Sequence, residues 1–115
     1  MAMHADITMR EGKGIVAIEG ALSEASVDAF REKVQEWMKV NAGTKNVVID
    51  AAKMEFIDSA GLGVLIALLK RASENGGNIR IAGLQAKSRV IFEITRAFKI
   101  FEIFDTVEEA LRADA

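Results

Sequence analysis

The stretch Phe56-Ile57-Asp58-Ser59-Ala60-Gly61-Leu62-Gly63 joins the end of an expected strand to the start of the most apolar helix in the chain. Helix N-termini present unpaired N–H groups and a positive dipole end, which stabilise an exposed carboxylate or phosphate by about 0.3–1 kcal/mol per charge. Asp58 and Ser59 therefore lie where an anion is favoured. Both residue types are also common as plain helix caps, which hydrogen-bond the backbone and do nothing else.

The first turns of this helix contain two glycines, Gly61 and Gly63, although Gly costs up to about 1 kcal/mol relative to Ala inside a helix. Small residues leave the backbone open to close approach by a protein or a phosphate. One apolar stripe is formed by Leu62, Leu65, Ile66 and Leu69, and Val64 and Leu68 lie off it. Taken singly, such residues are of core type. A helix on one sheet face needs one stripe, so the excess predicts that a neighbouring element or a partner protein covers the helix start.

The segments before this helix predict a hairpin, a helix and a strand. Residues 6–11 alternate in polarity, Gly12-Lys13-Gly14 supplies a turn, and residues 15–19 are largely apolar and β-branched. A helix is predicted from Ser26 to Asn41, with Ser23 or Ser26 as its cap, because apolar residues recur there at helical spacing: Val27, Phe30, Val34, Trp37 and Met38. Residues 46–50 predict a strand covered on at least one face, and residues 54–58 lead into the next helix.

The segments after it repeat the pattern in shorter form. The helix over residues 59–75 stops at Gly76-Gly77, and residues 78–82 alternate as a strand. A helix over residues 87–96 is predicted from Val90, Ile91 and Ile94, and a strand over residues 99–104 from alternation. Thr106 and Glu109 have capping-box spacing, which predicts a last helix to about Arg112. The fold class is therefore α/β: a mixed sheet that begins with a hairpin, has right-handed crossovers and is covered by about four helices.

Composition limits the function further. The chain has 115 residues, enough for one domain, and a net charge of −2, which gives no electrostatic argument for nucleic acid or an anionic membrane. It has no Cys and one His, which excludes thiolate chemistry and a His-cluster metal site. The six Phe and Trp37 are expected in the core. The longest stretch free of strongly polar side chains, residues 60–69, is too short to span a bilayer, and no signal peptide is evident, so we expect a cytoplasmic protein.

Two enzyme patterns are disfavoured. A hydrolase with Ser59 as nucleophile needs a base and the elbow G-x-S-x-G, whereas the segment here reads Ile57-Asp58-Ser59-Ala60-Gly61 and the one His lies near the N-terminus. Gly61 and Gly63 have neither the spacing of a dinucleotide-binding fingerprint nor that of a Walker loop. No catalytic residue is assigned.

The sequence resembles the STAS domains, and among them the bacterial anti-sigma factor antagonists. The resemblance covers about residues 7–111, so we expect a single domain over residues 6–113 after an N-terminal extension of residues 1–5. It rests on the element order, Gly20 after the second strand, the apolar strand ending in Asp50, and above all the stretch from Phe56 to Gly63. The later runs Val90-Ile91-Phe92 and Phe98-Lys99-Ile100-Phe101 also look like the family's third helix and last strand.

The resemblance implies a switch without catalysis or a cofactor of its own. In the family the Ser after the Asp, here Ser59, is phosphorylated by an anti-sigma factor that is also a serine kinase using ATP and Mg²⁺. The unmodified form binds that kinase and frees the sigma factor, the phosphorylated form lets go, and a serine phosphatase resets it. The implied partner-binding residues are Asp58, Ala60, Gly61, Leu62, Gly63, Ser23 and Glu24.

The chain departs from the family at two positions. Many phosphorylated members have an acidic residue just after the second strand, where this chain has Ser23, and Glu24 is the nearest substitute. Ala60 replaces the second Ser or Thr that often follows the phosphosite. Other STAS domains are not phosphorylated and serve as scaffolds in sensory complexes or as parts of membrane transporters, and this is the alternative function.

Overall fold

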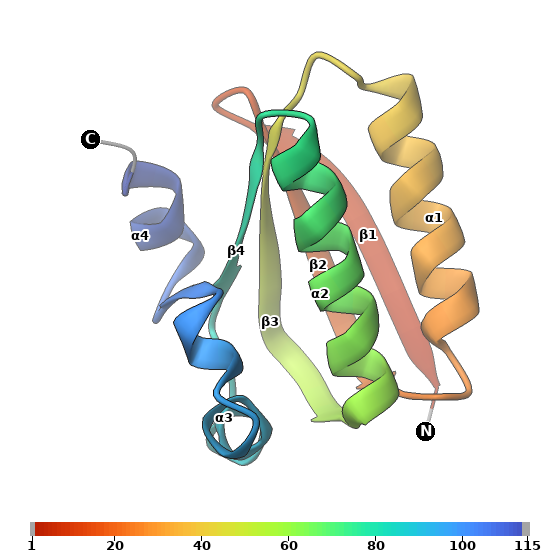
Figure 1. The fold of residues 1–115 in the computed structure, drawn as a ribbon, viewed down its shortest axis with the longest axis vertical. Helices are drawn as coiled ribbons and strands as arrows, with labels where there is room; N and C mark the ends of the chain where they lie inside the picture. Colours follow the sequence, from red (N-terminus) through yellow and green to blue (C-terminus); the bar gives the residue numbers. More distant parts are fainter. Residues whose placement is uncertain (1, 114–115) are drawn as a thin grey trace.

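The described part of the chain, residues 2–113 of a computed structural model, is built on a five-stranded sheet in the order β1-β2-β3-β4-β5 (Figure 1). The first pair of strands is antiparallel and the other three pairs are parallel. Helices connect the parallel strands, as the return path of a parallel connection requires. The predicted mixed α/β fold that begins with a hairpin is confirmed.

The hairpin consists of β1 (Met3–Arg10) and β2 (Lys13–Leu22). Its two-residue turn has positive φ at both central residues, 53° at Glu11 and 79° at Gly12, the geometry that matches the right-handed twist of the flanking strands. β1 begins at Met3, which pairs with Gly20, and Ala5 is buried. Residues 3–5 therefore belong to the sheet and not to the expected N-terminal extension, because alternation in this strand continues past Asp6 towards the N-terminus.

Two helices, α1 (Val27–Val40) and α2 (Ser59–Glu74), lie side by side on one face of the sheet (Figure 1). The main core between them and the strands includes Phe30, Leu65 and Ile49, all fully buried. Ser26 occupies the N-cap position of α1, but its hydroxyl donates to the Ala21 carbonyl at 2.8 Å and makes no side-chain cap. The predicted capping of this helix by a serine hydroxyl is therefore wrong for Ser26.

The central strand, β3 (Asn46–Ile57), is one strand of 12 residues and not a short strand followed by a separate lead-in. It pairs with β2 along its length, and two shifts of register absorb the irregularity, one between Ala17 and Glu19 and one between Gly20 and Ala21. Because both strands end together, at Leu22 and Ile57, the loop before α1 and the start of α2 emerge at the same end of the sheet.

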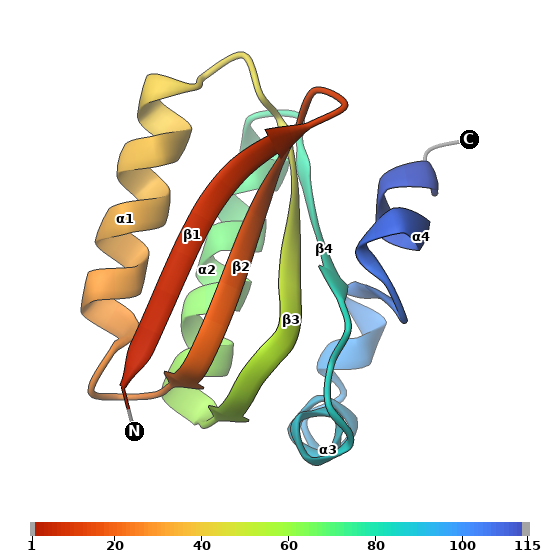
Figure 2. The ribbon, with the colours of Figure 1, turned by 180° about the vertical axis from the view of Figure 1, so that it is seen from behind.

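The last third of the chain contains β4 (Asn78–Ala82), α3 (Ala86–Ile94), the 3-10 turn η1 (Ala97–Lys99), β5 (Glu102–Phe104) and α4 (Val107–Arg112). α4 lies on the opposite face from α1 and α2, as the view from behind shows (Figure 2). A small second core forms beneath it from Ile15, Val48, Ala82, Ala110 and Leu111. The predicted cap of α4 is confirmed, because Thr106 Oγ1 accepts a hydrogen bond from the Glu109 N–H at 3.1 Å.

The structure corrects the prediction for residues 87–104. The predicted helix exists, but its buried residues are Ser88 and Phe92. Val90 and Ile94, from which the helix was predicted, are 51% and 76% exposed. The expected strand over residues 99–104 is reduced to three residues, since η1 occupies its beginning.

The aromatic residues are not all in the core as predicted. Phe30, Phe92 and Phe101 are buried, and Trp37 is half-buried against the main core. Phe56 and Phe98 are each 48% exposed. The phenylalanine at position 56 therefore lies at the surface two residues before Asp58.

Candidate functional site

Asp58 is the N-cap of α2 and ties two loops together. Its Oδ1 accepts a hydrogen bond from the Gly61 N–H at 2.8 Å, which satisfies one of the open donors of the first helical turn. Its Oδ2 accepts from the Glu24 N–H at 3.0 Å, across 34 positions of sequence. The carboxylate thus joins the loop after β2 to the start of α2, and both of its oxygens are engaged in this structure.

These contacts favour the charged form of Asp58. The hydrogen bond from the Gly61 N–H is the main cause that lowers the pKa of this carboxyl below its ordinary value, partial desolvation opposes it, and the Glu24 N–H adds to the lowering. Asp58 is therefore an anion at neutral pH. The predicted capping role is confirmed, and the further predicted role in partner contact stays a prediction.

Ser59 is the first residue of α2, and it is exposed. Its hydroxyl makes no hydrogen bond to any residue between 2 and 113, unlike the Asp58 carboxylate beside it. A side chain sealed beneath the surface would have excluded transfer of a phosphoryl group. Instead, Ser59 is an exposed residue at the positive end of a helix of 16 residues.

The two glycines of the first turns serve different purposes. A Cβ added at Gly61 would stand 2.1 Å from the Leu22 carbonyl oxygen and 2.9 Å from Ile57 Cγ1, so the close approach of α2 to the end of β2 requires glycine there. A Cβ added at Gly63 would meet no atom within 4 Å. Packing therefore explains Gly61, and nothing inside the described chain explains Gly63.

The exposed side of α2 begins at Ser59 and continues through Gly63, Ile66 and Ala67. These positions fall on one side of a helix because they are spaced by three or four residues. Ile66 is 37% exposed, whereas Leu62 is 4% exposed and Val64 2%. The excess of apolar residues in α2 is thus explained mainly by a broad buried face, and Ile66 is the large apolar side chain left at the surface.

The predicted partner-binding residues do not all lie at the surface. Leu62 and Gly61 are buried, so we remove their side-chain positions from the candidate contact surface. Ser23 and Ala60 are partly exposed, and Glu24 and Gly63 are exposed. Ala67 was not predicted as a surface position, and Ile66 was predicted in the core; both are exposed, as a helical projection counted from Ser59 indicates. We define the α2 surface as Ser59, Gly63, Ile66 and Ala67.

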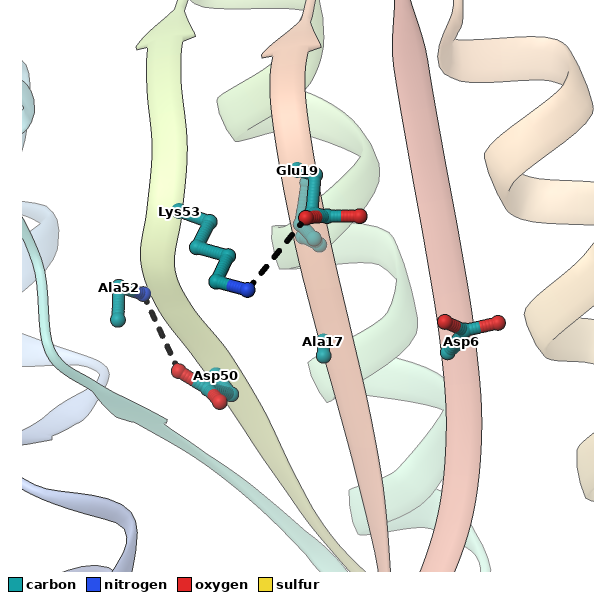
Figure 3. Close-up of a pocket in the computed structure, with 7 residues that line it drawn as sticks. Asp6, Ala17, Glu19, Asp50, Ala52 and Lys53 are labelled. Carbon is teal, nitrogen blue, oxygen red and sulfur yellow. Dashed lines mark hydrogen bonds and ion pairs between the residues drawn. The ribbon is translucent and has the colours of Figure 1, made fainter.

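A shallow hollow of about 190 Å³ lies elsewhere, on the face of the sheet that α1 and α2 leave open (Figure 3). Asp6, Glu19 and Asp50 line it, with Lys53 3.7 Å from Glu19 and the Ala52 N–H donating to Asp50 at 3.1 Å. Within residues 2–113 no cluster of His, Asp and Glu is arranged to hold a metal ion. The hollow contains no nucleophile paired with a base, and Ser59 does not line it.

The site thus consists of an exposed serine at the start of α2 and a neighbouring aspartate whose carboxylate accepts two backbone hydrogen bonds, at one end of the mixed sheet of a small α/β domain. The STAS domain profile matches residues 4–110, and the chain belongs to this family. None of the helices in the described part of the chain is long and apolar enough to cross a membrane.

Known proteins with this domain fall into more than one functional group. The anti-sigma F factor antagonist of Paenibacillus polymyxa is 26% identical over 111 residues, which cover 95% of this chain and 94% of that protein. SpoIIAA of Bacillus, an anti-sigma factor antagonist, is similar in fold in both of its solved forms. The unphosphorylated form has a TM-score of 0.70 at 18% identity, over 96% of this chain and 94% of that chain. The phosphorylated form has a TM-score of 0.72 at 16% identity, over 94% of this chain and 96% of that chain. A segment of the murine anion transporter Slc26a9, 18% of that chain, is similar in fold to 90% of this chain, with a TM-score of 0.78 and 20% identity.

Proposed function

We propose that this protein is an anti-sigma factor antagonist whose binding to an anti-sigma factor is ended by phosphorylation of Ser59. The observation that carries the proposal is Ser59, which is exposed at the first position of α2 and whose hydroxyl has no hydrogen bond to any residue between 2 and 113. The named relative over nearly the full length of the chain is an anti-sigma factor antagonist, and a fold neighbour is an antagonist solved in a phosphorylated form.

The partner in this proposal is an anti-sigma factor with serine kinase activity. The Ser59 oxygen attacks the γ-phosphorus of ATP bound with Mg²⁺ on that partner, the bond from phosphorus to the β,γ-bridging oxygen breaks, ADP leaves, and the hydroxyl proton passes to a base. Because both Asp58 oxygens already accept backbone hydrogen bonds, that base is expected from the kinase. The chain itself needs no cofactor and contributes the acceptor and the surface around it.

Phosphorylation acts as a switch through charge at the contact surface. A phosphoserine adds about −1.5 to −2 charges. The helix dipole stabilises this charge in the free protein, whereas the neighbouring Asp58 anion disfavours it. In a complex, the same charge placed between the α2 surface and the kinase adds repulsion and a desolvation cost. Since 1.4 kcal/mol corresponds to tenfold in affinity, a cost of about 3–4 kcal/mol changes binding by two to three decades without any change of fold.

The test is a phosphorylation reaction with the purified chain, ATP, Mg²⁺ and an anti-sigma factor of the serine kinase type from the same organism. Mass spectrometry of peptides should locate one phosphate on Ser59 in wild type and none in Ser59→Ala. Ser73→Ala is the matched control, because Ser73 is an exposed serine of the same helix. Phosphate on another residue, or on Ser59→Ala, contradicts the proposal.

Binding supplies the second half of the test. Ser59→Ala should remain bound to the kinase in the presence of ATP, while wild type should dissociate as it becomes phosphorylated. Ser59→Asp should bind more weakly than wild type, by less than the phosphorylated protein because Asp carries one negative charge. Equal affinities of wild type, phosphorylated protein and Ser59→Asp would show that charge at this position is not the switch. A serine phosphatase is expected to restore binding.

The second candidate is a scaffold or transporter-associated domain that is not phosphorylated. The match to a domain of Slc26a9 favours it at the level of the fold. On this reading the chain accepts no phosphate on Ser59 and is recovered from cell extracts with a membrane transporter or a sensory complex instead of an anti-sigma factor. Affinity capture of the chain followed by mass spectrometry of its partners distinguishes the two functions.

A further inference from the structure

The outer surface of α3 and η1 carries a concentration of exposed apolar side chains. Large apolar residues exposed within residues 2–113 are Met9, Val40, Phe56, Ile66, Val90, Ile94, Phe98 and Ile100. Half of them stand between positions 90 and 100, at 51%, 76%, 48% and 52% exposure. Exposed apolar side chains gathered on one short segment are typical of a protein contact surface.

These side chains are not alternative core residues. α3 already buries Ser88 and Phe92 on its inner side, and Phe92 packs edge-on against Phe101 with ring centroids 6.0 Å apart. Val90 and Ile94 are four positions apart on the outer side of the same helix, and η1 packs directly against α3. The inner side is therefore full, and no element among residues 2–113 covers the outer one.

The same segment has the opposite charge to the rest of the chain. Residues 86–100 contain four basic residues and one acidic residue, a local net charge of +3 in a chain whose net charge is −2. Arg89 is neutralised by Asp105 at 3.1 Å. Lys87, Arg96 and Lys99 form no ion pair with any described residue. Three cations without an ion-pair partner among residues 2–113 thus accompany the apolar side chains, and Glu93 is the one acidic residue of the segment.

We propose that this region is a second docking surface, which binds an acidic amphipathic segment of a protein partner. We define the α3–η1 surface by six residues: Lys87, Val90, Ile94, Phe98, Lys99 and Ile100. Charge complementarity selects the partner, since apolar side chains rimmed by unpaired cations match an apolar stripe bordered by Asp and Glu. The surface is distinct from the α2 surface and its use does not depend on Ser59.

Two other occupants fit the surface less well. A second copy joined by twofold symmetry would bring the same unpaired cations towards each other, which is unfavourable. A membrane requires apolar side chains that project deeply, whereas Val90, Phe98 and Ile100 are each about half covered by their own domain. Because these side chains project only partly from the surface, a protein partner must project its own apolar side chains to contact them.

The probe is a synthetic helical peptide of about 18 residues with a Leu face and a Glu and Gln face, compared with a twin in which Lys replaces Glu. Titrated into the ¹⁵N-labelled full chain, the acidic peptide should shift amide resonances within residues 86–100 and leave those at the start of α2 in place. The basic twin should bind at least about tenfold more weakly, and added salt should reduce this difference.

The variants Ile94→Ser and Lys99→Glu test the assignment. Both residues are exposed, so circular dichroism should match wild type. Ile94→Ser should weaken binding of the acidic peptide about tenfold, and Lys99→Glu should weaken it at low salt only. Val40→Ser is the matched control, because Val40 is 73% exposed on α1, and it should bind like wild type.

Three results would overturn the inference. They are equal binding of the two peptides, resonance shifts centred outside residues 86–100, and absence of binding to the acidic peptide. Vesicles of phosphatidylserine and phosphatidylcholine, compared with phosphatidylcholine alone, provide the membrane arm of the experiment. Binding of the chain to the anionic vesicles that is lost in Ile94→Ser would assign the surface to a membrane and reject a protein partner.

Discussion

The same substitution two residues apart in α2 should have opposite effects on stability. Gly61→Ala places a methyl group 2.1 Å from the Leu22 carbonyl oxygen, far inside van der Waals contact and against backbone that cannot rotate away. Gly63→Ala places it in open space. Both glycines are in the first two turns of the helix, so the intrinsic gain in helix propensity is similar for the two variants.

The magnitudes follow from these contacts. Gly63→Ala should raise the free energy of unfolding by about 0.4–1 kcal/mol, because alanine restricts the unfolded chain and favours the helix. Gly61→Ala has the same gain, but overpacking against the end of β2 costs about 1–3 kcal/mol or more, so the net effect is destabilising. In a domain of this size, 1 kcal/mol corresponds to a change in Tm of about 3–6 °C.

Urea denaturation followed by circular dichroism measures both variants against wild type. The binding assay adds a second readout: if the partner approaches α2 closely at Gly63, Gly63→Ala should be more stable than wild type and yet bind the anti-sigma factor more weakly. A destabilised Gly63→Ala, or a Gly61→Ala as stable as wild type, would refute the packing argument. A Gly63→Ala that binds with unchanged affinity would remove position 63 from the α2 surface.

Three further predictions concern single side chains. Ser88 is buried with no hydrogen-bond partner for its hydroxyl within the described residues, so Ser88→Ala should raise the free energy of unfolding by about 1 kcal/mol in urea titration. A variant less stable than wild type would show that the hydroxyl has a partner. Asp58→Ala should lower the free energy of unfolding by about 1 kcal/mol, and Asp58→Asn should lower it by less, because Asn can still cap the helix. Because the folded state lowers the pKa of Asp58, the stability that its charge contributes is present above the ordinary pKa of 3.8 and is lost as the pH falls through the lowered pKa. The difference in stability between wild type and Asp58→Asn should therefore shrink on acidification, and a constant difference in acid unfolding curves would contradict this. Ile66→Glu should weaken binding to the anti-sigma factor by at least about tenfold with an unchanged circular dichroism spectrum, whereas Leu62→Ala should cost about 2–5 kcal/mol of stability because that side chain is in the core.

Much of the fold can be predicted from short-range pattern in the sequence. The hairpin, α1 and α2 have strong periodicity and clear turn residues at their ends, and their bounds agree with the structure to within a few residues. The start of α1 was harder, because Ser26 turns its hydroxyl back to the Ala21 carbonyl instead of capping the helix. That choice depends on where β2 ends, which the local sequence does not encode.

The errors fall where tertiary contacts outweigh periodicity. In α3, Val90 and Ile94 face solvent although they fall at helical spacing, because Phe92 and Phe101 already occupy the inner side against the sheet. At the candidate site, sequence reasoning identified Asp58 and Ser59 from their place before a helix. It could not explain Gly61, whose requirement comes from Leu22, a residue 39 positions earlier that meets α2 only in the folded chain.

Ala2 lies at the same end of the sheet as the candidate site. The Ala2 carbonyl accepts a hydrogen bond from the Ala21 N–H at 3.1 Å, two residues before the loop that Asp58 holds, while α4 ends near the other end of the sheet (Figure 1). A fluorophore, affinity handle or fused reporter attached near Ala2 is therefore expected at the end of the sheet where Ser59 lies, and it should hinder a partner that docks there. The same label attached beyond α4 should leave that approach clear, so comparing the affinities of the two labelled proteins indicates from which side the partner binds.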